Sequence, residues 1–412
     1  MTPDARRVLA RIEQLFAIAA GEGGGASRPA FSAAEARAML LVAGWARQAG
    51  LEPAADPHGN LWCLPPGDAQ CVTSGSHLDT VPDGGRYDGA LGTVLAVEAV
   101  GRVGGNRGVV VCAAEEASRF GAGTLGSRSM TGKLSDEELS RLRDAAGRDA
   151  LTARAEYLDA LGDLPRLERA PLERMGSHVE VHIEQRADLR GRGLSLGVAT
   201  TIAGPARRRL RFAGEVAHAG ETPAVERRDA LCAAAETALL AERLGRGYAP
   251  QTTATVGTLK VHPNSLTTIP GAAELGVDVR SVLPGAARLL LDELLNGARQ
   301  AAGKRGVRLG EDFLSEAEPT QMAGMMVTAV EEACGRLGVS CGRCVSFAGH
   351  DAQHLAAVAP AALLFVASEN GASHAPGESL AGGDLQAALR VLCALAEDLQ
   401  GAQTPQTLRG RR

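Results

Sequence analysis

The chain has 412 residues, of which 45% are hydrophobic and 3% aromatic. This length predicts about two domains with packed cores, and the hydrophobic fraction excludes a disordered protein. The net charge is −5 and the basic residues are scattered, so we expect no nucleic-acid partner.

The N-terminal segment and the cysteines indicate a compartment. The apolar run "LFAIAA" is shorter than the core of a signal peptide, and no apolar stretch approaches the ~18 residues that span a bilayer. We therefore predict no membrane partner and a cytoplasmic location, in keeping with eight dispersed cysteines. Cys341 and Cys344 have CxxC spacing, but without a second pair we favour two ordinary thiols over a zinc or redox site.

The first predicted helix covers residues 32–50. Ser32 and Glu35 form a capping-box pattern at its start, and Gly50 is a plausible end. The segments "HGNLWCL" and "CVTSGSHLD" then predict short strands separated by turns.

Residues 107–116, "RGVVVCAAEE", are typical of a buried strand that ends in polar residues. Residues 135–162 are charged and predict a helix, with Ser135 and Glu138 as another capping-box pattern. The clean alternation of "HVEVHIEQ" (178–185) predicts a strand with one solvent-exposed face.

The pattern changes in residues 203–315, where a strand, a helix, two strands and a second helix are expected. This order is typical of a small α+β sandwich with helices on one face. Beyond it, residues 320–338 and 384–400 predict helices flanking short strands such as "AALLFVA". We therefore predict an α/β fold whose larger domain, residues 1–202 and 316–412, is split by the smaller one.

Histidines and carboxylates cluster where predicted strands end. The segment "SGSHLDTVPDGGRYDGALG" contains His77 and Asp79, which would share one face of a strand, and Asp88 after a glycine-rich turn. An Asp in the position of Asp79 can accept the second N–H of a metal-bound imidazole.

Further polar residues follow in three other segments: Glu115 and Glu116, then His182 and Glu184, then His374 in "ASHAPGE". Each alone is more often a structural or solvated group than a ligand. Their repetition at four predicted strand ends favours a ligand site, because such sites form at strand ends in α/β domains.

Seven motifs occur in the order seen in one enzyme family: "GSHLDTVPDGGRYDGALG", "EEASRFGAGTLGSRSMTG", "HIEQ", "HAGETPAVERRDAL", "IPG…VDVR", "AGHDAQHLA" and "SHAPGE". They resemble the M20 metallopeptidase superfamily, most closely its hydantoinase/carbamoylase branch of N-carbamoyl-L-amino acid hydrolases, β-ureidopropionases and allantoate amidohydrolases. The resemblance covers residues from about 10 to 400. It implies a zinc-exopeptidase-like catalytic domain with an inserted lid and dimerisation domain.

The resemblance also implies roles for individual residues. Asp88 would bridge two divalent ions and Glu115 would be the general base. Imidazole and carboxylate ligands suit Zn²⁺ or Mn²⁺. The implied metal ligands are His77, Asp88, Glu116, His182 and His374.

The same pattern implies a small-molecule substrate with a free carboxylate and a homodimer. His218 of "HAG" would stabilise the oxyanion from the neighbouring subunit. Arg280 would bind the substrate carboxylate with its bidentate fork, and Gln185 would contact the carbamoyl or ureido group.

Two positions depart from the family pattern. Thr267 stands where relatives carry an Asn that binds substrate, so one hydroxyl replaces an amide with a donor end and an acceptor end. Arg186 follows "HIEQ" in place of the usual Gly and either favours a more acidic substrate or points to solvent. We expect an active amidohydrolase that cleaves a linear C–N bond, with an uncommon substrate.

Two alternatives stay open. The first is an M20 dipeptidase or N-acyl amino acid hydrolase, against which His182 argues, because peptidase relatives usually carry Asp there. The second is a non-catalytic metal-binding accessory protein, against which Glu115 argues, because a binding protein needs no base beside the metal.

Overall fold

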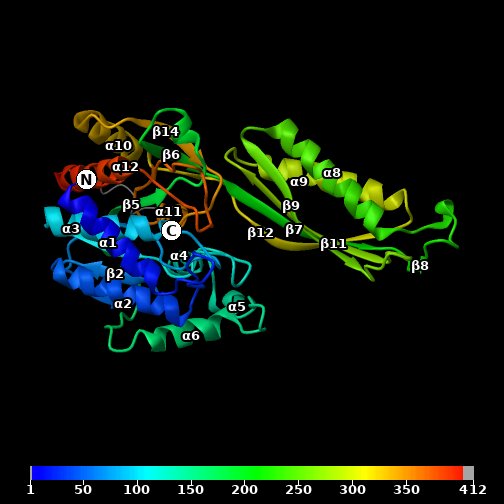
Figure 1. The fold of residues 1–412 in the computed structure, drawn as a ribbon, viewed down its shortest axis with the longest axis horizontal. Helices are drawn as coiled ribbons and strands as arrows, with labels where there is room; N and C mark the ends of the chain where they lie inside the picture. Colours follow the sequence, from blue (N-terminus) through cyan, green and yellow to red (C-terminus); the bar gives the residue numbers. More distant parts are fainter. Residues whose placement is uncertain (1, 402–412) are drawn as a thin grey trace. The chain divides into compact units, whose positions relative to one another are not determined.

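The computed structural model describes residues 2–401 (Figure 1). Contacts within the chain divide it into two units. Unit 1 runs up to Thr200 and also contains Gln321–Cys344 and the chain from Gly349 onward, and unit 2 consists of Thr201–Thr320 and Val345–Ala348. In the part of the chain that the structure describes, no helix is long and apolar enough to cross a membrane.

Unit 1 combines one large sheet with helices. Its helices are α1 (Pro3–Ala17), α2 (Ala33–Gln48), α3 (Ala90–Val103), α4 (Leu125–Met130), α5 (Asp136–Leu139), α6 (Ala150–Ala160), η1 (Leu172–Arg174), α7 (Asp188–Gly191), α10 (Gly324–Leu337), α11 (Ala352–Leu355) and α12 (Gly382–Gly401). The strands of its sheet are β1 (Glu52–Ala55), β2 (Leu61–Leu64), β3 (Cys71–Gly75), β4 (Arg107–Val111), β5 (Met175–Ile183), β6 (Leu196–Ile202), β13 (Thr320–Gln321), β14 (Cys341–Ser346) and β15 (Ala361–Val366).

The strand order is β1-β2-β4-β3-β5-β15-β6-β13, with β14 paired to β6. The four central strands β4, β3, β5 and β15 are parallel to one another. All residues of β3 and of β4 are buried, because helices cover both faces of the sheet. The helices α3 and α12 contact each other and the central strands, whereas α4 and α11 lie near a separate apolar cluster around Trp62 and Val110.

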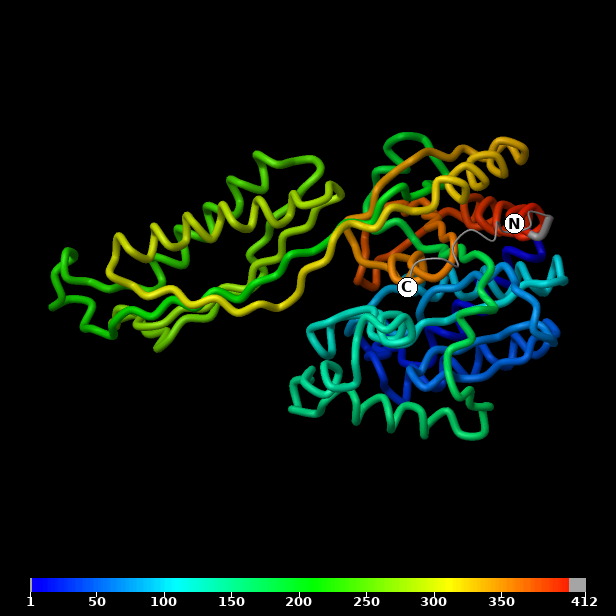
Figure 2. Tube along the Cα trace, turned by 180° about the vertical axis from the view of Figure 1, so that it is seen from behind, coloured from blue at the N-terminus to red at the C-terminus, as the bar shows by residue number. Residues whose placement is uncertain are grey.

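Unit 2 contains β7 (Gly204–Ala213), β8 (Ala217–His218), η2 (Ala224–Glu226), α8 (Ala230–Tyr248), β9 (Thr252–His262), β10 (Thr268–Ile269), β11 (Ala272–Ser281), α9 (Ala286–Gly303) and β12 (Arg308–Glu316). Four antiparallel strands form a sheet in the order β12-β7-β11-β9. The chain segments that begin and end this unit run side by side, because the Ala317 amide donates to the Pro205 carbonyl at 2.9 Å (Figure 2).

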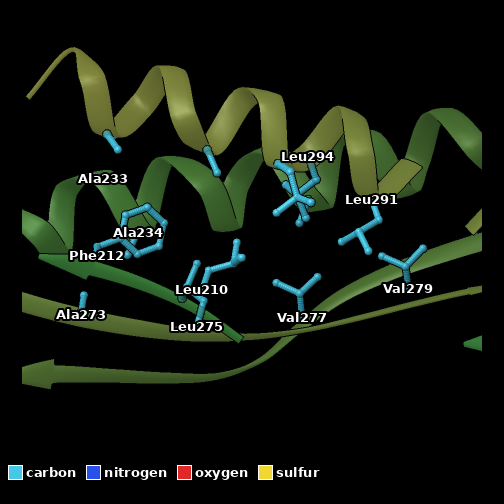
Figure 3. Packing of buried hydrophobic residues seen from close by; sticks show 14 of the residues in the cluster. Leu210, Phe212, Ala233, Ala234, Ala273, Leu275, Val277, Val279, Leu291 and Leu294 are labelled. Atoms are coloured by element: carbon cyan, nitrogen blue, oxygen red, sulfur yellow. The ribbon is translucent and has the colours of Figure 1, made fainter. Parts of the chain in front are cut away.

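The core of unit 2 lies between its sheet and the two helices α8 and α9 (Figure 3). Alternate residues of β11, including Leu275, Val277 and Val279, point toward the helices and are buried. Leu291 and Leu294 of α9 meet them from above and are fully buried. The period-2 pattern of the strand and the 3.6-residue pattern of the helix thus share one apolar layer.

The predicted capping patterns have different outcomes. Ser32 caps α2 by accepting from the Glu35 amide at 3.2 Å, but the Glu35 carboxylate does not return to the Ser32 amide. At Ser135 both halves of the capping box form with Glu138, yet α5 has only four residues. The prediction of one helix over residues 135–162 is therefore wrong in its middle, where a turn precedes α6.

One strand prediction is wrong, and the strand β12 was not predicted. The expected solvent-exposed face of residues 178–185 is wrong, because β5 lies between β3 and β15 and is buried on both faces. Its alternating polar residues point into polar sites inside the protein. β12 is an edge strand whose sequence "RLGEDFLSE" is charged and half-exposed and therefore lacks the apolar alternation that predicts a strand.

Candidate metal centre

The carboxyl ends of the four parallel strands carry the predicted site residues. His77 follows β3, Glu115 and Glu116 follow β4, His182 is the penultimate residue of β5, and His374 lies in the segment after β15. His77 is not on a strand as predicted, since β3 ends at Gly75 and His77 forms only an isolated bridge to Cys112. Parallel strands bring these segments to the same edge of the sheet, where ligand sites form in α/β folds.

One group of possible metal ligands consists of His77, Asp88 and His182, all buried. Asp88 Oδ1 lies 3.2 Å from Nε2 of each imidazole. The two Nε2 atoms are 3.5 Å apart. A tetrahedral ion with bonds of about 2.0–2.1 Å separates its ligand atoms by about 3.3–3.4 Å, so this spacing fits one ion.

A second group consists of Asp88, Glu116 and His374. His374 Nε2 lies 3.6 Å from Asp88 Oδ2 and 3.3 Å from Glu116 Oε1. Asp88 therefore presents a different oxygen to each group. In the part of the chain that the structure describes, these two are the only groups with this geometry.

The protonation of the two buried imidazoles follows from their other ring nitrogen. Nδ1 of His77 lies 3.1 Å from the Asp79 carbonyl, and Nδ1 of His182 lies 2.8 Å from the Ile183 carbonyl. A carbonyl can only accept, so each Nδ1 carries a proton, and in the neutral form of each ring, which is the form that binds a metal, Nε2 has a free lone pair. Two lone pairs facing each other and Asp88 are the arrangement that a bound cation requires.

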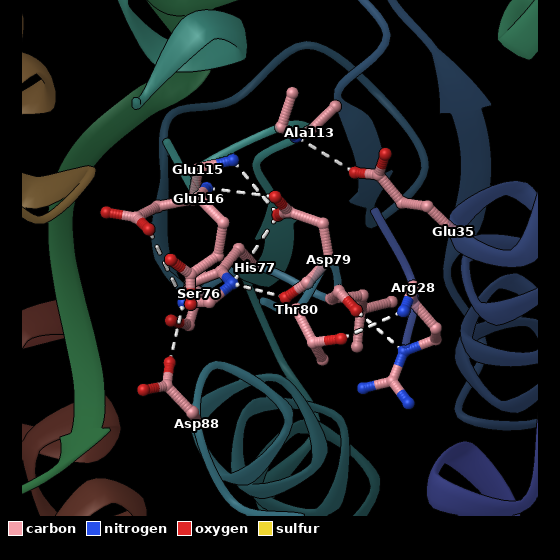
Figure 4. A network of polar contacts seen from close by, with 12 residues as sticks. Arg28, Glu35, Ser76, His77, Asp79, Thr80, Asp88, Ala113, Glu115 and Glu116 are labelled. Atoms are coloured by element: carbon pink, nitrogen blue, oxygen red, sulfur yellow. Dashed lines mark hydrogen bonds and ion pairs between the residues drawn. The ribbon is translucent and has the colours of Figure 1, made fainter. Parts of the chain in front are cut away.

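The carboxylate of Asp79 holds the backbone of the neighbouring loop (Figure 4). Its two oxygens accept from the amides of Glu115 and Glu116, each at 2.9 Å. The predicted contact with His77 is longer, with 3.5 Å between Nδ1 and Oδ1. Asp79 thus orients the two glutamates more directly than it orients His77.

Charge in the site is unbalanced without a cation. Burial and the charge of Asp88 raise the pKa of Glu116 to about 8. Burial also raises the pKa of Glu115 well above its ordinary value, and Glu116 and Asp351 add to this shift against the opposing charge of His77. Divalent cations would remove the repulsion among these carboxylates, so the donor set fits a metal.

Glu115 lies at the edge of the first group without belonging to it. Its Oε2 is 3.9 Å from His77 Nε2. The side chain is therefore close enough to reach a water or substrate bound at the site, while the ligand atoms come from its neighbours.

The segment 74–92 is rich in glycine, and at two of these positions a larger side chain would collide with residues of the site. Gly89 has φ of +63°, and a Cβ there would lie 2.6 Å from the His77 ring. A Cβ on Gly85 would lie 2.4 Å from Oε2 of Glu378. That carboxylate accepts from the amides of Tyr87, at 2.6 Å, and Asp88, at 3.0 Å, and so fixes the backbone of Asp88.

Three further residues lie near the site, and the sequence alone did not predict a role for them. Glu378 belongs to the motif "SHAPGE", four residues after His374. His350 packs edge-on against His182 with ring centroids 4.7 Å apart, and Asp351 accepts from Ser127 Oγ at 2.5 Å. All three lie in the family motifs "SHAPGE" and "AGHDAQHLA", and this position was the signal in the sequence that could have identified them.

Gln185 lies beside the site, and Arg186 points elsewhere. Gln185 Nε2 is 3.4 Å from Asp88 Oδ2. Arg186 is exposed, which agrees with the interpretation that its side chain points to solvent.

His218 and Thr267 belong to unit 2, where they lie side by side. The short strands β8 and β10 pair His218 with Thr268, and the Ala219 amide donates to the Thr267 carbonyl at 3.0 Å. Nδ1 of His218 accepts from the amides of Gly220 and Glu221 at 3.1 and 3.2 Å. The proton of a neutral His218 is therefore on Nε2, which makes the exposed ring a hydrogen-bond donor.

Arg280 also belongs to unit 2, near the end of β11. Its guanidinium pairs with Asp278, with 2.9 Å between Nη2 and Oδ2, and Nη1 donates to the Phe347 carbonyl at 2.7 Å. Asp278 is shared with Arg207 at 3.0 Å. A substrate carboxylate would have to compete with Asp278 for the fork of Arg280.

Comparison with known proteins identifies the family. Residues 74–398 match the model of peptidase family M20/M25/M40. The chain belongs to this family. It is 36% identical over 382 residues to an N-carbamoyl-L-amino acid amidohydrolase of Geobacillus stearothermophilus, covering 90% of this chain and 93% of that protein.

Other relatives place the chain in the same branch. An allantoate amidohydrolase of Bacillus subtilis is 32% identical over 393 residues, covering 92% of this chain and 94% of the relative. The crystal structure of an amidase of the hydantoinase/carbamoylase family from Burkholderia vietnamiensis superimposes with a TM-score of 0.85 at 32% identity, covering 95% and 97% of the two chains. The predicted M20 fold, the hydantoinase/carbamoylase branch and a hydrolase acting on non-peptide C–N bonds are confirmed.

Proposed function

We propose that the protein is a binuclear metal-dependent amidohydrolase that removes a carbamoyl or ureido group from a small carboxylate. The observation that carries this proposal is the pair of ligand groups that share Asp88 through different oxygens, with Glu115 beside them. His77 and His182 would complete one ion site, and Glu116 and His374 the other. We propose Zn²⁺ or Mn²⁺, because the donors are imidazoles and carboxylates.

When bound, two such cations polarise an amide carbonyl and lower the pKa of a water molecule. Glu115 then takes a proton from the attacking water and delivers it to the leaving nitrogen. Burial raises the pKa of the Glu115 carboxyl, so its ionised form is a stronger base than that of a solvent-exposed glutamate. Gln185 offers an amide beside Asp88 that can bind the carbamoyl or ureido group.

His218 supplies a hydrogen bond to the oxyanion that develops in the transition state. Its Nδ1 is occupied by two backbone amides, so Nε2–H is the group available to a substrate. Such a donor acts on charge that is absent from the ground state and so raises kcat more than it lowers KM. Arg280 binds the substrate carboxylate once Asp278 releases it.

We propose a homodimer because Arg280 and His218 lie at opposite ends of unit 2, too far apart to contact one substrate molecule from the same chain. Arg280 lies eight residues along β11 from Ala272, which is about 27 Å at the usual rise of a strand. His218 and Thr267 lie beyond the Ala272 end, where Figure 1 labels β8. A carbamoyl amino acid is far shorter than this separation. A site that uses both Arg280 and His218 therefore needs unit 2 from two chains.

A hydrolysis screen tests the function. The protein is loaded with Mn²⁺ or Zn²⁺ and incubated with N-carbamoyl-L-amino acids, allantoate, ureidoglycolate, dipeptides and N-acetyl amino acids. We expect ammonia release from one or more carbamoyl or ureido compounds, at a rate of order 10 s⁻¹ for its preferred substrate. Cleavage of dipeptides or N-acetyl amino acids alone would favour a peptidase or acylase.

The metal stoichiometry is tested separately. We expect two equivalents in the wild type, because five ligand residues form two groups around Asp88. Asp88→Ala removes the shared carboxylate and is expected to lose both cations and activity. If Asp88→Ala retains two cations and full activity, Asp88 is not the bridging ligand. A cytoplasmic location stays a prediction of the sequence.

A further inference from the structure

The segment between β4 and α4 is held in an unusual way. Beyond the end of the strand, four consecutive backbone amides donate to side-chain oxygens from other parts of unit 1, not to a neighbouring strand. The pairs are Ala113 with Asn60 Oδ1 at 3.0 Å, Ala114 with Glu35 Oε1 at 2.9 Å, and Glu115 and Glu116 with the two oxygens of Asp79 at 2.9 Å. The side chains of Glu115 and Glu116 leave this segment toward the metal centre.

Ala114 has a backbone conformation that an alanine rarely adopts. Its φ is +55°, in the left-handed region, directly before Glu115. Phe31 has a similar φ of +52°, and its amide donates to the other oxygen of the same carboxylate at 2.5 Å. Glu35 therefore holds two strained residues at once. Strain of this kind persists only where surrounding contacts fix it, and it is frequent at active sites.

Among the described residues, the Glu35 carboxylate accepts hydrogen bonds from two backbone amides, and the charges of Arg28 and Asp79 lie nearby. Glu35 is fully buried, and neither oxygen returns to Ser32 as a capping box would require. Both oxygens are used by Phe31 and Ala114. Figure 4 shows the side chain reaching from α2 toward the segment that carries Glu115 and Glu116. The carboxylate thus connects the start of α2 to the loop of the metal centre.

We propose that Glu35 is a positioning residue, which holds Ala114 in its left-handed conformation and thereby aims Glu115 and Glu116 at the metal centre. The effect on Glu115 rests on the proposed function. The effect on Glu116 requires only that the centre binds a cation, so cation affinity tests the proposal without reference to any substrate.

The test variant is Glu35→Gln. A glutamine has one acceptor and one donor end, so one of the two amides would face an N–H₂ group. We expect the affinity for Mn²⁺, measured by calorimetry on the metal-free protein, to fall about 10–100-fold, the usual scale for residues that orient ligands. We expect kcat to fall by a similar factor while KM changes less than about twofold.

The matched control is Ser32→Ala. It removes the hydroxyl that caps α2, and it weakens the same helix end without touching Ala114. Its melting temperature should fall while Mn²⁺ affinity and kcat remain at wild-type values. The double variant Glu35→Gln/Ala114→Gly should recover part of the lost affinity, because glycine adopts a positive φ without steric cost.

Wild-type Mn²⁺ affinity in folded Glu35→Gln would overturn the proposal, and so would an equal loss in Ser32→Ala. If Glu35→Gln does not fold, Glu35→Asp replaces it. Asp keeps the charge but is too short to reach both amides, and wild-type affinity there would overturn the proposal as well. A wild type that binds two cations but releases no ammonia from any compound refutes the proposed function alone. A wild type that binds no cation refutes both.

Discussion

The two units of the chain differ in how deeply they bury the polar residues to which we assign a function. Unit 1 buries them: His77, Asp79 and Glu35 are each 1% exposed or less, and each has defined partners. Unit 2 has an apolar layer between its sheet and its helices and also buries Arg208, Thr237, Thr252 and Ser281, whereas His218 and Thr267 lie exposed at one end. Buried polar groups are costly unless paired, so unit 1 can fix its geometry before any ligand arrives.

This difference predicts different consequences for the two units. The residues of unit 1 form a complete centre within one chain. In unit 2 the side chains of His218 and Thr267 are exposed, so under the proposed function they would act only against another surface. Variants in each unit test this difference, because they should affect cation binding, activity and stability differently.

The largest effect is expected from Glu115→Gln in unit 1. Glutamine keeps the shape of the side chain but cannot accept the proton from water. We expect kcat to fall about 10²–10⁴-fold with two cations still bound, since Glu115 lies outside both ligand groups. Metal analysis and ammonia release measure the two quantities. If Glu115→Gln loses a cation and Glu116→Gln does not, the roles of the two residues are reversed.

The next effect is expected from His218→Ala in unit 2. Loss of one oxyanion donor costs about 10²–10³-fold in kcat, while cation binding in unit 1 should be unchanged. Mixing His218→Ala chains with Glu115→Gln chains should restore partial activity through hybrid dimers, because one of the two sites then has both groups. Absence of recovery despite demonstrated subunit exchange would show that His218 serves its own chain.

The contribution of the apolar layer in unit 2 can be tested through protein stability, without an activity assay. Leu291→Ala removes a fully buried side chain of α9 and should lower the stability of unit 2 by about 3 kcal/mol. Leu289→Ala lies two residues away on the same helix, where the side chain is 63% exposed, and should cost less than about 0.5 kcal/mol. Amide hydrogen exchange over residues 204–316 measures both, and Mn²⁺ affinity should be unchanged in either variant.

In unit 2, the sequence predicted those strands and helices whose residues alternate between the core and solvent. The patterns of β7, β11, α8 and α9 were visible because one side of each faces an apolar layer. β12 was missed because an edge strand that pairs Arg211 with Asp312 and exposes Phe313 has no such pattern.

Unit 1 was harder to predict for the opposite reason. The buried polar residues of β5 alternate as a half-exposed strand does, so its second face was placed in solvent. The resemblance named the residues that the structure brings together, but it could not indicate the role of Glu35. A carboxylate at the third position of a helix predicts a local capping box, whereas the contact with Ala114 spans 79 positions and is visible only in the fold.

The smallest effect is expected from Thr267→Asn, at the exposed end of unit 2. Thr267 lies beside His218, where the family pattern has an Asn whose amide can both donate and accept. Restoring one substrate hydrogen bond should raise kcat/KM for ordinary N-carbamoyl-L-amino acids about tenfold, since such a bond contributes about 1–1.5 kcal/mol. Thr268→Asn is the matched control, because the Thr268 hydroxyl donates a hydrogen bond to Ser265 Oγ at 3.3 Å.

If wild type already turns over these substrates at about 10 s⁻¹, the substitution at position 267 is neutral and the expectation of an uncommon substrate is wrong. A gain in Thr267→Asn but not in Thr268→Asn would instead make Thr267 a specificity residue, and its exposed side chain can be replaced with little loss of stability.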